Sequence, residues 1–269
     1  MSSIKRVLVT GATSGMGRAM AVQLARRGWR VAMTGRRAAK LEAAVAAVRA
    51  AGGEPLPLLG SVTEIETVRE HYARIRRQWG GLDWAILNAG VGDSKGALEF
   101  SAENYRWTLA TNVGGVVNWM EVVLPDMIAA GSGTIAGISS LAAFRGLPKS
   151  GPYCASKAAL LALLESVRLD LRGTGVKIVT ICPGFVRSEL TDRNDARDMR
   201  FILDTEDGAR RILRGVERGQ RLVHFPWQIS WPMVHIARHL PGWLYDRFIG
   251  TFAKKHPKKP YIDESAKRR

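Results

Sequence analysis

Residues 7–17 read Val-Leu-Val-Thr-Gly-Ala-Thr-Ser-Gly-Met-Gly. The run Val7–Thr10 predicts a buried strand, and the pattern after the glycines predicts a helix. Glycines in such a turn allow a tight bend and a close approach of the backbone to phosphate, and the N-terminus of a helix attracts negative charge. A glycine-rich turn placed directly between a strand and a helix therefore predicts a nucleotide-binding site at the start of the chain.

Short β-branched runs go on alternating with longer helical patterns as far as residue 183. The predicted strands are Val7–Thr10, Arg30–Thr34, Glu54–Leu59, Trp84–Leu87, Gly133–Ser139 and Lys177–Cys182. Helices are predicted near residues 16–28, 38–51, 63–79, 103–130 and 152–173. This alternation predicts an α/β fold with a doubly wound parallel sheet in three layers, a Rossmann fold.

The pattern changes after Pro183. Residues 185–205 are polar and charged, which predicts a substrate loop with short helices, and Thr205–Arg218 and Gln220–Phe225 predict a last helix and strand. Because no linker rich in Pro, Gly or Ser divides the chain, we expect one domain over residues 1–225. An aromatic and basic C-terminal extension follows over residues 226–269.

Composition limits the partners. The chain has 269 residues and a net charge of +16, with 40 Lys and Arg against 24 Asp and Glu. Such a protein attracts anions, whether phosphorylated cofactors, acidic membranes or nucleic acid. The charges are scattered through helices without a recognition module, so we expect no nucleic-acid partner. His224 and His235 lack the spacing of metal ligands, and we expect no metal.

Several features predict a cytoplasmic protein. Cys154 and Cys182 are the two cysteines, too few for a disulfide framework. No secretory signal is visible at the N-terminus, and no apolar stretch approaches the ~20 residues of a transmembrane helix.

The end of the second predicted strand indicates which nucleotide binds. An acidic residue there would bind the ribose 2′-hydroxyl of NAD. This chain has Gly35, Arg36 and Arg37 instead. Guanidinium groups pair well with phosphate, so the sequence predicts NADP(H), with Arg36 as the better candidate of the two.

Tyr153 and Lys157 are four residues apart in a predicted helix, thirteen residues after Ser140. Residues at this spacing point the same way on a helix. An unperturbed tyrosine has a pKa near ~10, and a neighbouring cation lowers that pKa because it stabilises the phenolate. Tyr153 is therefore a candidate for proton transfer near neutral pH.

Together these motifs resemble the short-chain dehydrogenase/reductase superfamily, in its single-domain form. The resemblance covers roughly residues 4–190. It rests on Thr10-Gly11-x-x-x-Gly15-x-Gly17, Asn88-Ala89-Gly90, Asn112, Ser140, Tyr153-x-x-x-Lys157 and Pro183-Gly184, in the family's order and spacing.

The resemblance implies an NADP(H)-dependent oxidoreductase that interconverts a carbonyl and an alcohol. It makes Tyr153 the general acid, Lys157 the group that lowers its pKa and binds the nicotinamide ribose, and Ser140 the partner of the substrate oxygen. It makes Asn112 the holder of a water that links Lys157 to solvent, beside the alternative that Asn112 satisfies a helix kink. The implied cofactor contacts are Gly11, Thr13, Ser14, Gly15, Met16, Gly17, Arg36, Arg37, Ser61, Val62, Asn88, Ala89, Gly90, Tyr153, Lys157, Pro183, Gly184, Val186 and Ser188.

Some positions depart from the family's pattern. Leu87 replaces an Asn before Asn88, and Ser61 stands where many relatives carry an Asp beside the adenine. Ser188 stands where the family often has a Thr. Two other functions stay open: an epimerase or dehydratase with the same catalytic residues, and a non-catalytic, membrane-associated NADP-binding regulator.

The extension is unusually aromatic, and a Lys cluster follows it. It lacks the C-terminal ending with which many relatives build a tetramer, so a homodimer is the expected assembly. The extension could cover the substrate cleft, bind a second subunit, or lie on an anionic membrane as a peripheral contact. We expect the cleft walls to be apolar, with Leu141, Phe144, Leu147, Phe185 and Leu190, and the substrate to be an apolar carbonyl compound.

Overall fold

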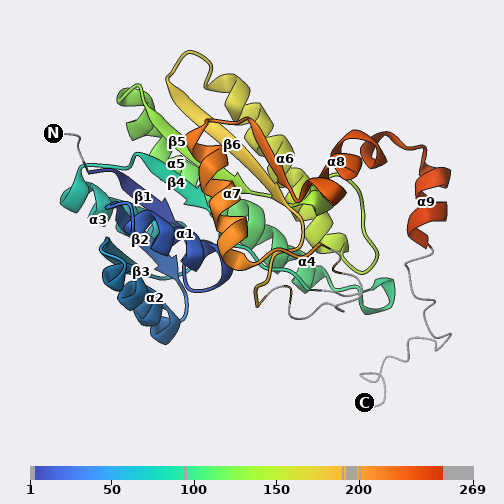
Figure 1. Cartoon of the computed structure of the whole chain (residues 1–269), viewed down its shortest axis with the longest axis horizontal. Coiled ribbons are helices and arrows are strands. Elements are labelled where there is room, and N and C mark those ends of the chain that lie inside the picture. Colours follow the sequence, from blue (N-terminus) through green and yellow to red (C-terminus); the bar gives the residue numbers. More distant parts are fainter. Residues whose placement is uncertain (1–3, 94–95, 190, 192–198, 200, 251–269) are drawn as a thin grey trace.

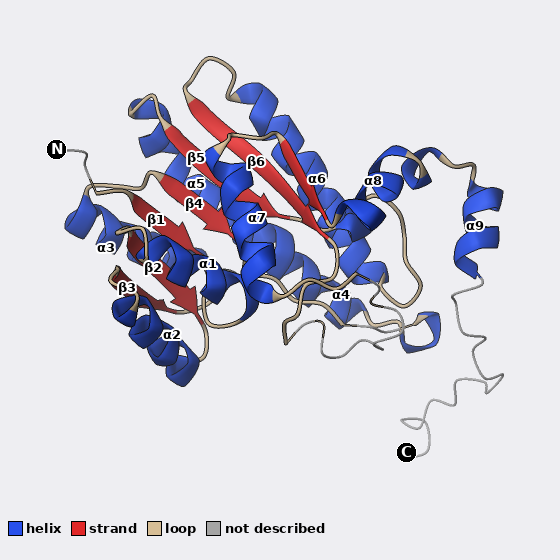
Figure 2. Ribbon diagram, viewed as in Figure 1, coloured by secondary structure: helices blue, strands red, loops and turns tan. Residues whose placement is uncertain are grey.

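The computed structural model describes residues 4–93, 96–189, 191, 199 and 201–250. A seven-stranded parallel sheet crosses the molecule in the order β3-β2-β1-β4-β5-β6-β7 (Figures 1 and 2). Its strands are β1 (Arg6–Val9), β2 (Arg30–Gly35), β3 (Glu54–Leu59), β4 (Trp84–Leu87), β5 (Gly133–Ile138), β6 (Val176–Pro183) and β7 (Leu222–Phe225). The predicted doubly wound sheet is confirmed, since the strand order turns back from β3 to β1 and then runs outward through β4.

Helices cover both faces of the sheet and complete three layers (Figure 2). One face carries α1 (Gly15–Ala25), α2 (Ala38–Ala50) and α7 (Thr205–Glu217). The other carries α3 (Ile65–Trp79), α4 (Ala102–Leu109), α5 (Gly115–Ala129) and α6 (Gly151–Asp170). Beyond β7 lie α8 (Trp227–His235) and α9 (Gly242–Gly250), and short 3₁₀ turns occupy η1 (Ala97–Glu99), η3 (Leu141–Ala143) and η5 (Ala237–His239).

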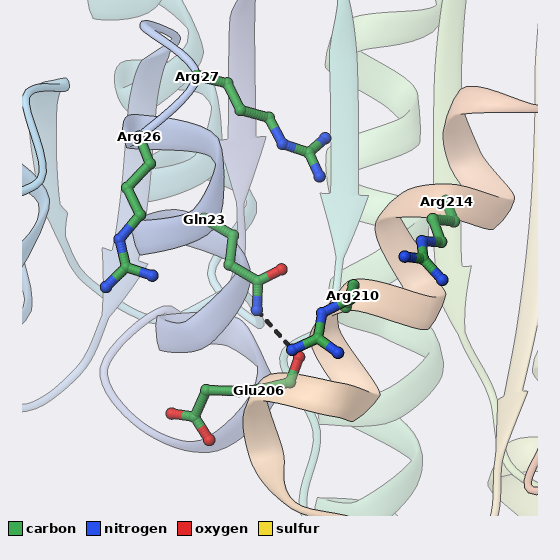
Figure 3. A pocket seen from close by; sticks show the side chains of 6 residues that line it. All are labelled: Gln23, Arg26, Arg27, Glu206, Arg210 and Arg214. Carbon is green, nitrogen blue, oxygen red and sulfur yellow. Dashed lines mark hydrogen bonds between the residues drawn. The ribbon is translucent and has the colours of Figure 1, made fainter.

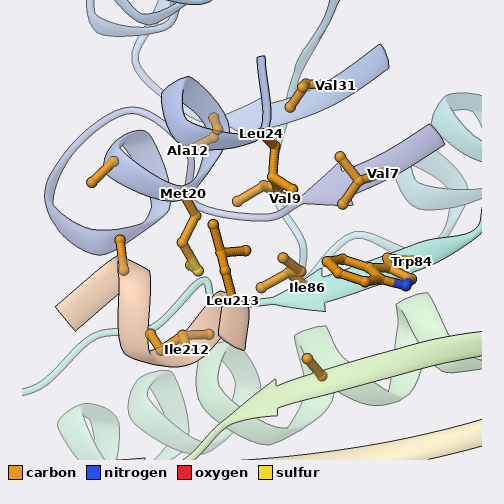
Figure 4. Close-up of a cluster of buried hydrophobic side chains, with 14 of the residues drawn as sticks. Val7, Val9, Ala12, Met20, Leu24, Val31, Trp84, Ile86, Ile212 and Leu213 are labelled. Atoms are coloured by element: carbon orange, nitrogen blue, oxygen red, sulfur yellow. The ribbon is translucent and has the colours of Figure 1, made fainter. Parts of the chain in front are cut away.

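The two-residue period of a strand divides the core between the faces. Val7 and Val9 of β1 are buried against α1 and α7, whereas Leu8 between them is buried on the opposite face. Figure 4 shows the first cluster, in which Met20 of α1 and Leu213 of α7 meet the strand side chains. Burying an aliphatic side chain of this size contributes about 1.5–3 kcal/mol, so the clusters fix the sheet between its helices.

The prediction of a single helix over residues 103–130 is wrong in one respect. The segment contains two helices, α4 and α5, which are joined by the π-helical turn η2 (Ala110–Gly114). Local propensity gives no reason for a wider turn there. Asn112 lies within this turn, and its side-chain contacts are described with the site below.

The segment after β6 is only partly described. Val186 forms a parallel bridge with Leu203, and the described residues between 185 and 205 contain no helix before α7 begins at Thr205. Within the described residues, no helix is both long and apolar enough to cross a bilayer.

The carboxyl ends of the strands gather the predicted site residues at one edge of the sheet. β1 leads into the glycine turn, β2 into Arg36, β4 into Asn88, and β5 into Ser140. Because all the strands are parallel, these loops meet on the same side. The fold thus positions the candidate site.

Candidate active site

The glycine turn after β1 is packed against the loop after β4. Gly11 has a φ of +64°, and a Cβ there would come within 2.9 Å of the Ala89 Cα atom. A Cβ on Gly17 would lie 2.3 Å from the Gly11 carbonyl oxygen and 2.6 Å from the Asn88 amide nitrogen. Side chains at these two positions would push the loops apart, which is the physical reason for glycine here.

Hydrogen bonds lock the two loops together. The Thr10 hydroxyl accepts from the backbone N–H of Asn88 at 2.8 Å and of Ala89 at 2.9 Å. The Asn88 side-chain amide donates to the Thr10 carbonyl at 3.0 Å. The predicted role of Asn88-Ala89-Gly90 as a sheet-stabilising turn beside the glycine turn agrees with these contacts.

The N-terminus of α1 is suited to an anion. Ser14 is the N-cap residue, and its side chain accepts no hydrogen bond from the first turn. The first-turn amides therefore keep their donors, and the helix dipole adds positive potential. Gly15 has a φ of +51°, and a Cβ there would lie 3.1 Å from the Ser188 Cβ atom, so the two residues are neighbours. This cradle fits the phosphates of a dinucleotide.

A cluster of cations follows β2. Arg36 is exposed and has no ion pair with any residue that the structure describes. Arg37 donates to a Glu189 carboxylate oxygen at 2.8 Å, and the Lys40 ammonium lies 2.5 Å from the other oxygen. These two cations hold the pKa of Glu189 below its usual range, with Lys40 the larger influence. Glu189 was not predicted from the sequence, because only the fold brings it to Arg37.

The predicted adenine side of the site is built from Ser61 and Val62. The Ser61 hydroxyl lies 2.8 Å from the Thr63 hydroxyl, so it is engaged within its own turn. Val62 is buried, and a Cβ on Gly115 of α5 would lie 2.5 Å from one of its methyl groups. Val62 therefore packs mainly against α5, which leaves little of its side chain for a ligand.

The three predicted acid–base residues lie together at the end of β5. Lys157 is buried, its ammonium donates to the Ile138 carbonyl at 2.8 Å, and it lies 5.6 Å from the centre of the Tyr153 ring. Ser140 forms a hydrogen bond with Tyr153 and accepts another from the Ala142 backbone N–H at 3.2 Å. Tyr153 itself is half-buried, so a substrate can reach it.

Burial acts on the pKa values of both Tyr153 and Lys157 in this structure. Burial raises the pKa of Tyr153, and the opposing hydrogen bond from Ser140 does not reverse this. Burial also lowers the pKa of Lys157 to about 8. Lys157 is turned toward the Ile138 carbonyl, and its own charge is disfavoured by the same burial. Among the protein's own groups, the effect of burial on the pKa of Tyr153 is thus larger than any opposing effect of Lys157.

Asn112 lies in the π-helical turn, and its side chain is held by three hydrogen bonds. Its side-chain oxygen accepts from the Val91 backbone N–H at 2.8 Å, and its amide donates to the Val91 carbonyl and to the Ser156 hydroxyl, both at 2.9 Å. A Cβ on Gly90 would come within 3.3 Å of Asn112 and 3.5 Å of the Lys157 nitrogen. The structure supports the kink alternative and also brings Asn112 close to Lys157.

The last predicted contacts lie after β6. Gly184 lies under α8, since a Cβ there would come within 2.8 Å of Ile229, and Pro183 is buried. Val186 is buried against α7, so only its backbone could touch a cofactor. Ser188 shares hydrogen bonds with Thr191, which closes a short turn over Gly15.

Comparisons with known proteins bear on the family and the fold of the chain. A family profile described as short chain dehydrogenase matches residues 5–198. The chain belongs to the short-chain dehydrogenase/reductase family. An uncharacterized oxidoreductase of Myxococcus xanthus is 43% identical over 244 residues, which are 91% of this chain and 96% of that protein. The 3-oxoacyl-[acyl-carrier-protein] reductase FabG of Staphylococcus aureus is 31% identical over 71% of this chain and 78% of its own.

A solved structure supports the family's fold. Levodione reductase matches with a TM-score of 0.78 at 23% identity, covering 84% of this chain and 98% of its own. At this level of sequence identity, the structural similarity supports a shared fold only. The short-chain dehydrogenase/reductase identification and the Rossmann fold predicted from the sequence are thus confirmed.

Two of the residues expected to line the substrate cleft belong to the hydrophobic core instead. Leu141 and Phe144 are buried in a small cluster with Cys182 and Val234 of α8, because the extension packs over them. Leu147 and Phe185 are partly exposed and remain candidates, and Leu190 lies outside the described residues. Cys154 is buried and accepts from the Leu147 backbone N–H at 3.4 Å, which favours a structural role.

Two hollows flank α1. The larger, about 630 Å³, reaches Gly15, Ser188 and Glu189 at the candidate cofactor site. The smaller, about 380 Å³, lies between α1 and α7 (Figure 3). Its lining is Gln23, Arg26, Arg27, Glu206, Arg210 and Arg214, which includes none of the predicted catalytic residues. Among the described residues no group of His, Cys, Asp and Glu could hold a metal ion.

Proposed function

We propose that this oxidoreductase interconverts a ketone or aldehyde and an alcohol with NADP(H) as the hydride carrier. The observation that carries the proposal is the meeting of Ser140, Tyr153 and Lys157 at the sheet edge that also carries the glycine turn. The hydroxyl groups of Ser140 and Tyr153 lie together, and Tyr153 is partly exposed, so the pair is suited to transferring a proton to a substrate oxygen atom. The bound nicotinamide would supply the hydride, and its oxidised form a positive charge.

The chain's own residues would hold that group in two places. The glycine turn and the first-turn amides of α1 would bind the pyrophosphate. Arg36, an exposed guanidinium without an ion-pair partner among the described residues, would bind the 2′-phosphate. Arg37 and Lys40 would add to this charge if they part from Glu189. The donor set therefore fits NADP(H) better than NAD(H).

Tyr153 would move the proton and Ser140 would hydrogen-bond the substrate oxygen, where charge develops during the reaction. The raised pKa of Tyr153 keeps its phenol protonated at neutral pH. A protonated phenol is the form that donates the proton in carbonyl reduction, and the phenolate is the form that accepts one in alcohol oxidation. Lys157 would bind the nicotinamide ribose, and Asn112 would hold the water that connects Lys157 to solvent.

An apolar carbonyl compound is the proposed substrate class. Leu147 and Phe185 are partly exposed beside the catalytic residues, and α8 closes that side of the site with further apolar side chains. The S. aureus relative is named a reductase of a 3-oxoacyl group, which is such a carbonyl. A homodimer and a cytoplasmic location remain predictions beside this function.

The replacement of Tyr153 by Phe tests the proposal. Purified Tyr153→Phe should lose about 10²–10⁴-fold in turnover of a ketone panel while it keeps its NADPH affinity, because only the proton donor is removed. Tyr72→Phe is the matched control, since Tyr72 donates to Asp126 on α5 at 2.7 Å, away from the site. Full activity of Tyr153→Phe would overturn the mechanism. Product formation without net NADPH consumption would favour the epimerase or dehydratase.

A further inference from the structure

The C-terminal helices present large apolar side chains to solvent. Trp227 is 72% exposed, Trp231 53%, Ile236 47% and Trp243 72%. Trp227 and Trp231 are one helical turn apart on α8, so they extend from the same side of that helix. We call the three exposed tryptophans, Trp227, Trp231 and Trp243, the tryptophan set. Figure 1 shows α8 and α9 extending beyond the sheet, at the right of the view.

Other side chains of the same helices hold the extension in place. Val234 is buried with Leu141 and Phe144. The Tyr245 hydroxyl donates to the Gly146 carbonyl at 2.7 Å, and the Arg145 guanidinium lies 4.2 Å from the centre of the Tyr245 ring. The extension is therefore attached without the tryptophan set. Trp231 contacts His235 of its own helix, with ring centroids 5.5 Å apart, but all three indoles stay largely exposed, which indicates a surface for an external partner.

The charge of the region narrows the choice of partner. Residues 226–269 contain nine Lys or Arg and three Asp or Glu. Tryptophan prefers the boundary between water and lipid headgroups, and each basic residue near an anionic bilayer adds to the attraction. A second copy of this chain would carry the same net charge of +16, so apposing two such regions brings like charges together. Charge complementarity thus favours an anionic lipid surface over self-association.

We propose that α8 and α9 dock the protein peripherally on anionic bilayers, with the tryptophan set at the headgroup level. The helices would lie on the surface, in the manner of interfacial helices that combine aromatic and basic residues. Because Val234 and Tyr245 pack on the segment directly after Ser140, docking would hold the substrate side of the site close to the lipid. An apolar substrate could then enter from the membrane. Lipid binding does not depend on the proposed reaction.

Vesicle flotation of the full chain tests this proposal. The protein should bind vesicles of phosphatidylcholine mixed with phosphatidylglycerol more tightly than vesicles of phosphatidylcholine alone, and added salt should weaken the binding. Tryptophan emission should shift to the blue as the indoles leave water. The triple variant Trp227→Ser, Trp231→Ser, Trp243→Ser should lose about tenfold or more in partitioning, since binding scales with the apolar area buried.

Controls separate lipid contact from other effects. The double variant Phe100→Ser, Trp107→Ser removes exposed aromatics elsewhere, 73% and 40% exposed, and should bind vesicles as the unchanged protein does. Trp243→Ser alone should leave folding intact and should show part of the loss in vesicle partitioning. Equal binding of the triple variant and the unchanged protein would overturn the proposal. So would a dimer that binds no vesicles and dissociates in the triple variant. Loss of lipid binding with retained turnover would leave the proposed reaction untouched.

Discussion

The carboxylate of Glu189 lies 2.8 Å from the Arg37 guanidinium and joins the loop after β6 to the cations after β2. Lys40 completes this contact on the other carboxylate oxygen. Both cations follow Arg36 closely in the chain, and Arg36 is the group proposed to bind the 2′-phosphate of NADP(H). A carboxylate that neutralises Arg37 and Lys40 thus competes with that phosphate, and its release would free two positive charges for the cofactor.

Replacement of Glu189 by Gln should therefore tighten NADPH binding by about two- to fivefold, as expected for an exposed ion pair. NADH lacks the 2′-phosphate, and its affinity should not change. Fluorescence titration of both nucleotides measures the difference. Glu217→Gln is the control, because Glu217 pairs with Arg27 instead. Weaker NADPH binding by Glu189→Gln would contradict the competition and would mean that Glu189 orders the site.

Replacement of Arg36 by Ala should weaken NADPH binding by about tenfold or more, because a charge-assisted hydrogen bond to the phosphate is lost. NADH affinity should stay within about twofold. The same titrations report both values, with Arg49→Ala as a control at an exposed arginine near the end of α2. If NADPH and NADH weaken equally, Arg36 does not read the 2′-phosphate and the proposed cofactor choice is wrong.

The parts of the fold that follow from local patterns were predictable. The predicted bounds Glu54–Leu59 and Trp84–Leu87 agree with β3 and β4, because both segments are short and mainly apolar, as strands of a parallel sheet are. The edge strand β7 is less well predicted than the other edge strand, β3, since β7 begins at Leu222 and not at Gln220. In β7, Leu222 is half-buried and His224 is a polar residue, so periodicity marks its start poorly.

The site could be predicted only where its residues lie in compact motifs. Gly11, Gly15 and Gly17 lie within seven residues, and their position directly between a strand and a helix indicates a phosphate site. Ser156, which bonds Asn112, and Glu189, which bonds Arg37, come from distant segments. No sequence pattern relates such pairs, because the sheet order decides which loops meet. The raised pKa of Tyr153 was missed for a similar reason, since burial is a property of the whole fold.

The lowered pKa of Lys157 predicts a pH-dependent stability. Its folded-state pKa of about 8 lies below the ordinary value of 10.5. The unfolded chain therefore holds more protons than the folded one between these values, and the contribution of Lys157 to stability rises with pH across that window. As pH falls through about 8, this contribution is lost because the folded protein must carry a buried charge.

Replacement of Lys157 by Met removes this titration. Relative to the unchanged protein, Lys157→Met should have its highest unfolding free energy near neutral pH. This relative stability should fall by up to about 3 kcal/mol as the pH rises to ~10, because the unchanged protein gains stability over that range. Thermal or urea unfolding across this range measures it. Lys177→Met, at an exposed lysine on β6, should show no such trend. A pH-independent difference for Lys157→Met would mean that the Lys157 pKa is not lowered.

Asn112 should be a determinant of local structure as well as a candidate for the proton path. Its fully buried side chain satisfies both backbone groups of Val91 and the Ser156 hydroxyl. Asn112→Ala would remove the side-chain partners of both Val91 backbone groups, at about 1–3 kcal/mol for each buried group left unpaired, whereas the Ser156 hydroxyl would still donate to the Tyr153 carbonyl. We expect a loss of about 2 kcal/mol or more in unfolding free energy and faster hydrogen exchange at the Val91 amide.

Asn118→Ala provides the comparison for this prediction. Asn118 lies on α5 and makes one side-chain hydrogen bond, to the Val62 carbonyl at 2.9 Å. Its replacement should cost about 1 kcal/mol and leave exchange at Val91 unchanged. Equal destabilisation by the two variants, with normal exchange at Val91, would show that the π-helical turn does not need Asn112. A larger loss for Asn112→Ala would mean that one side chain both shapes the turn and holds it beside Lys157.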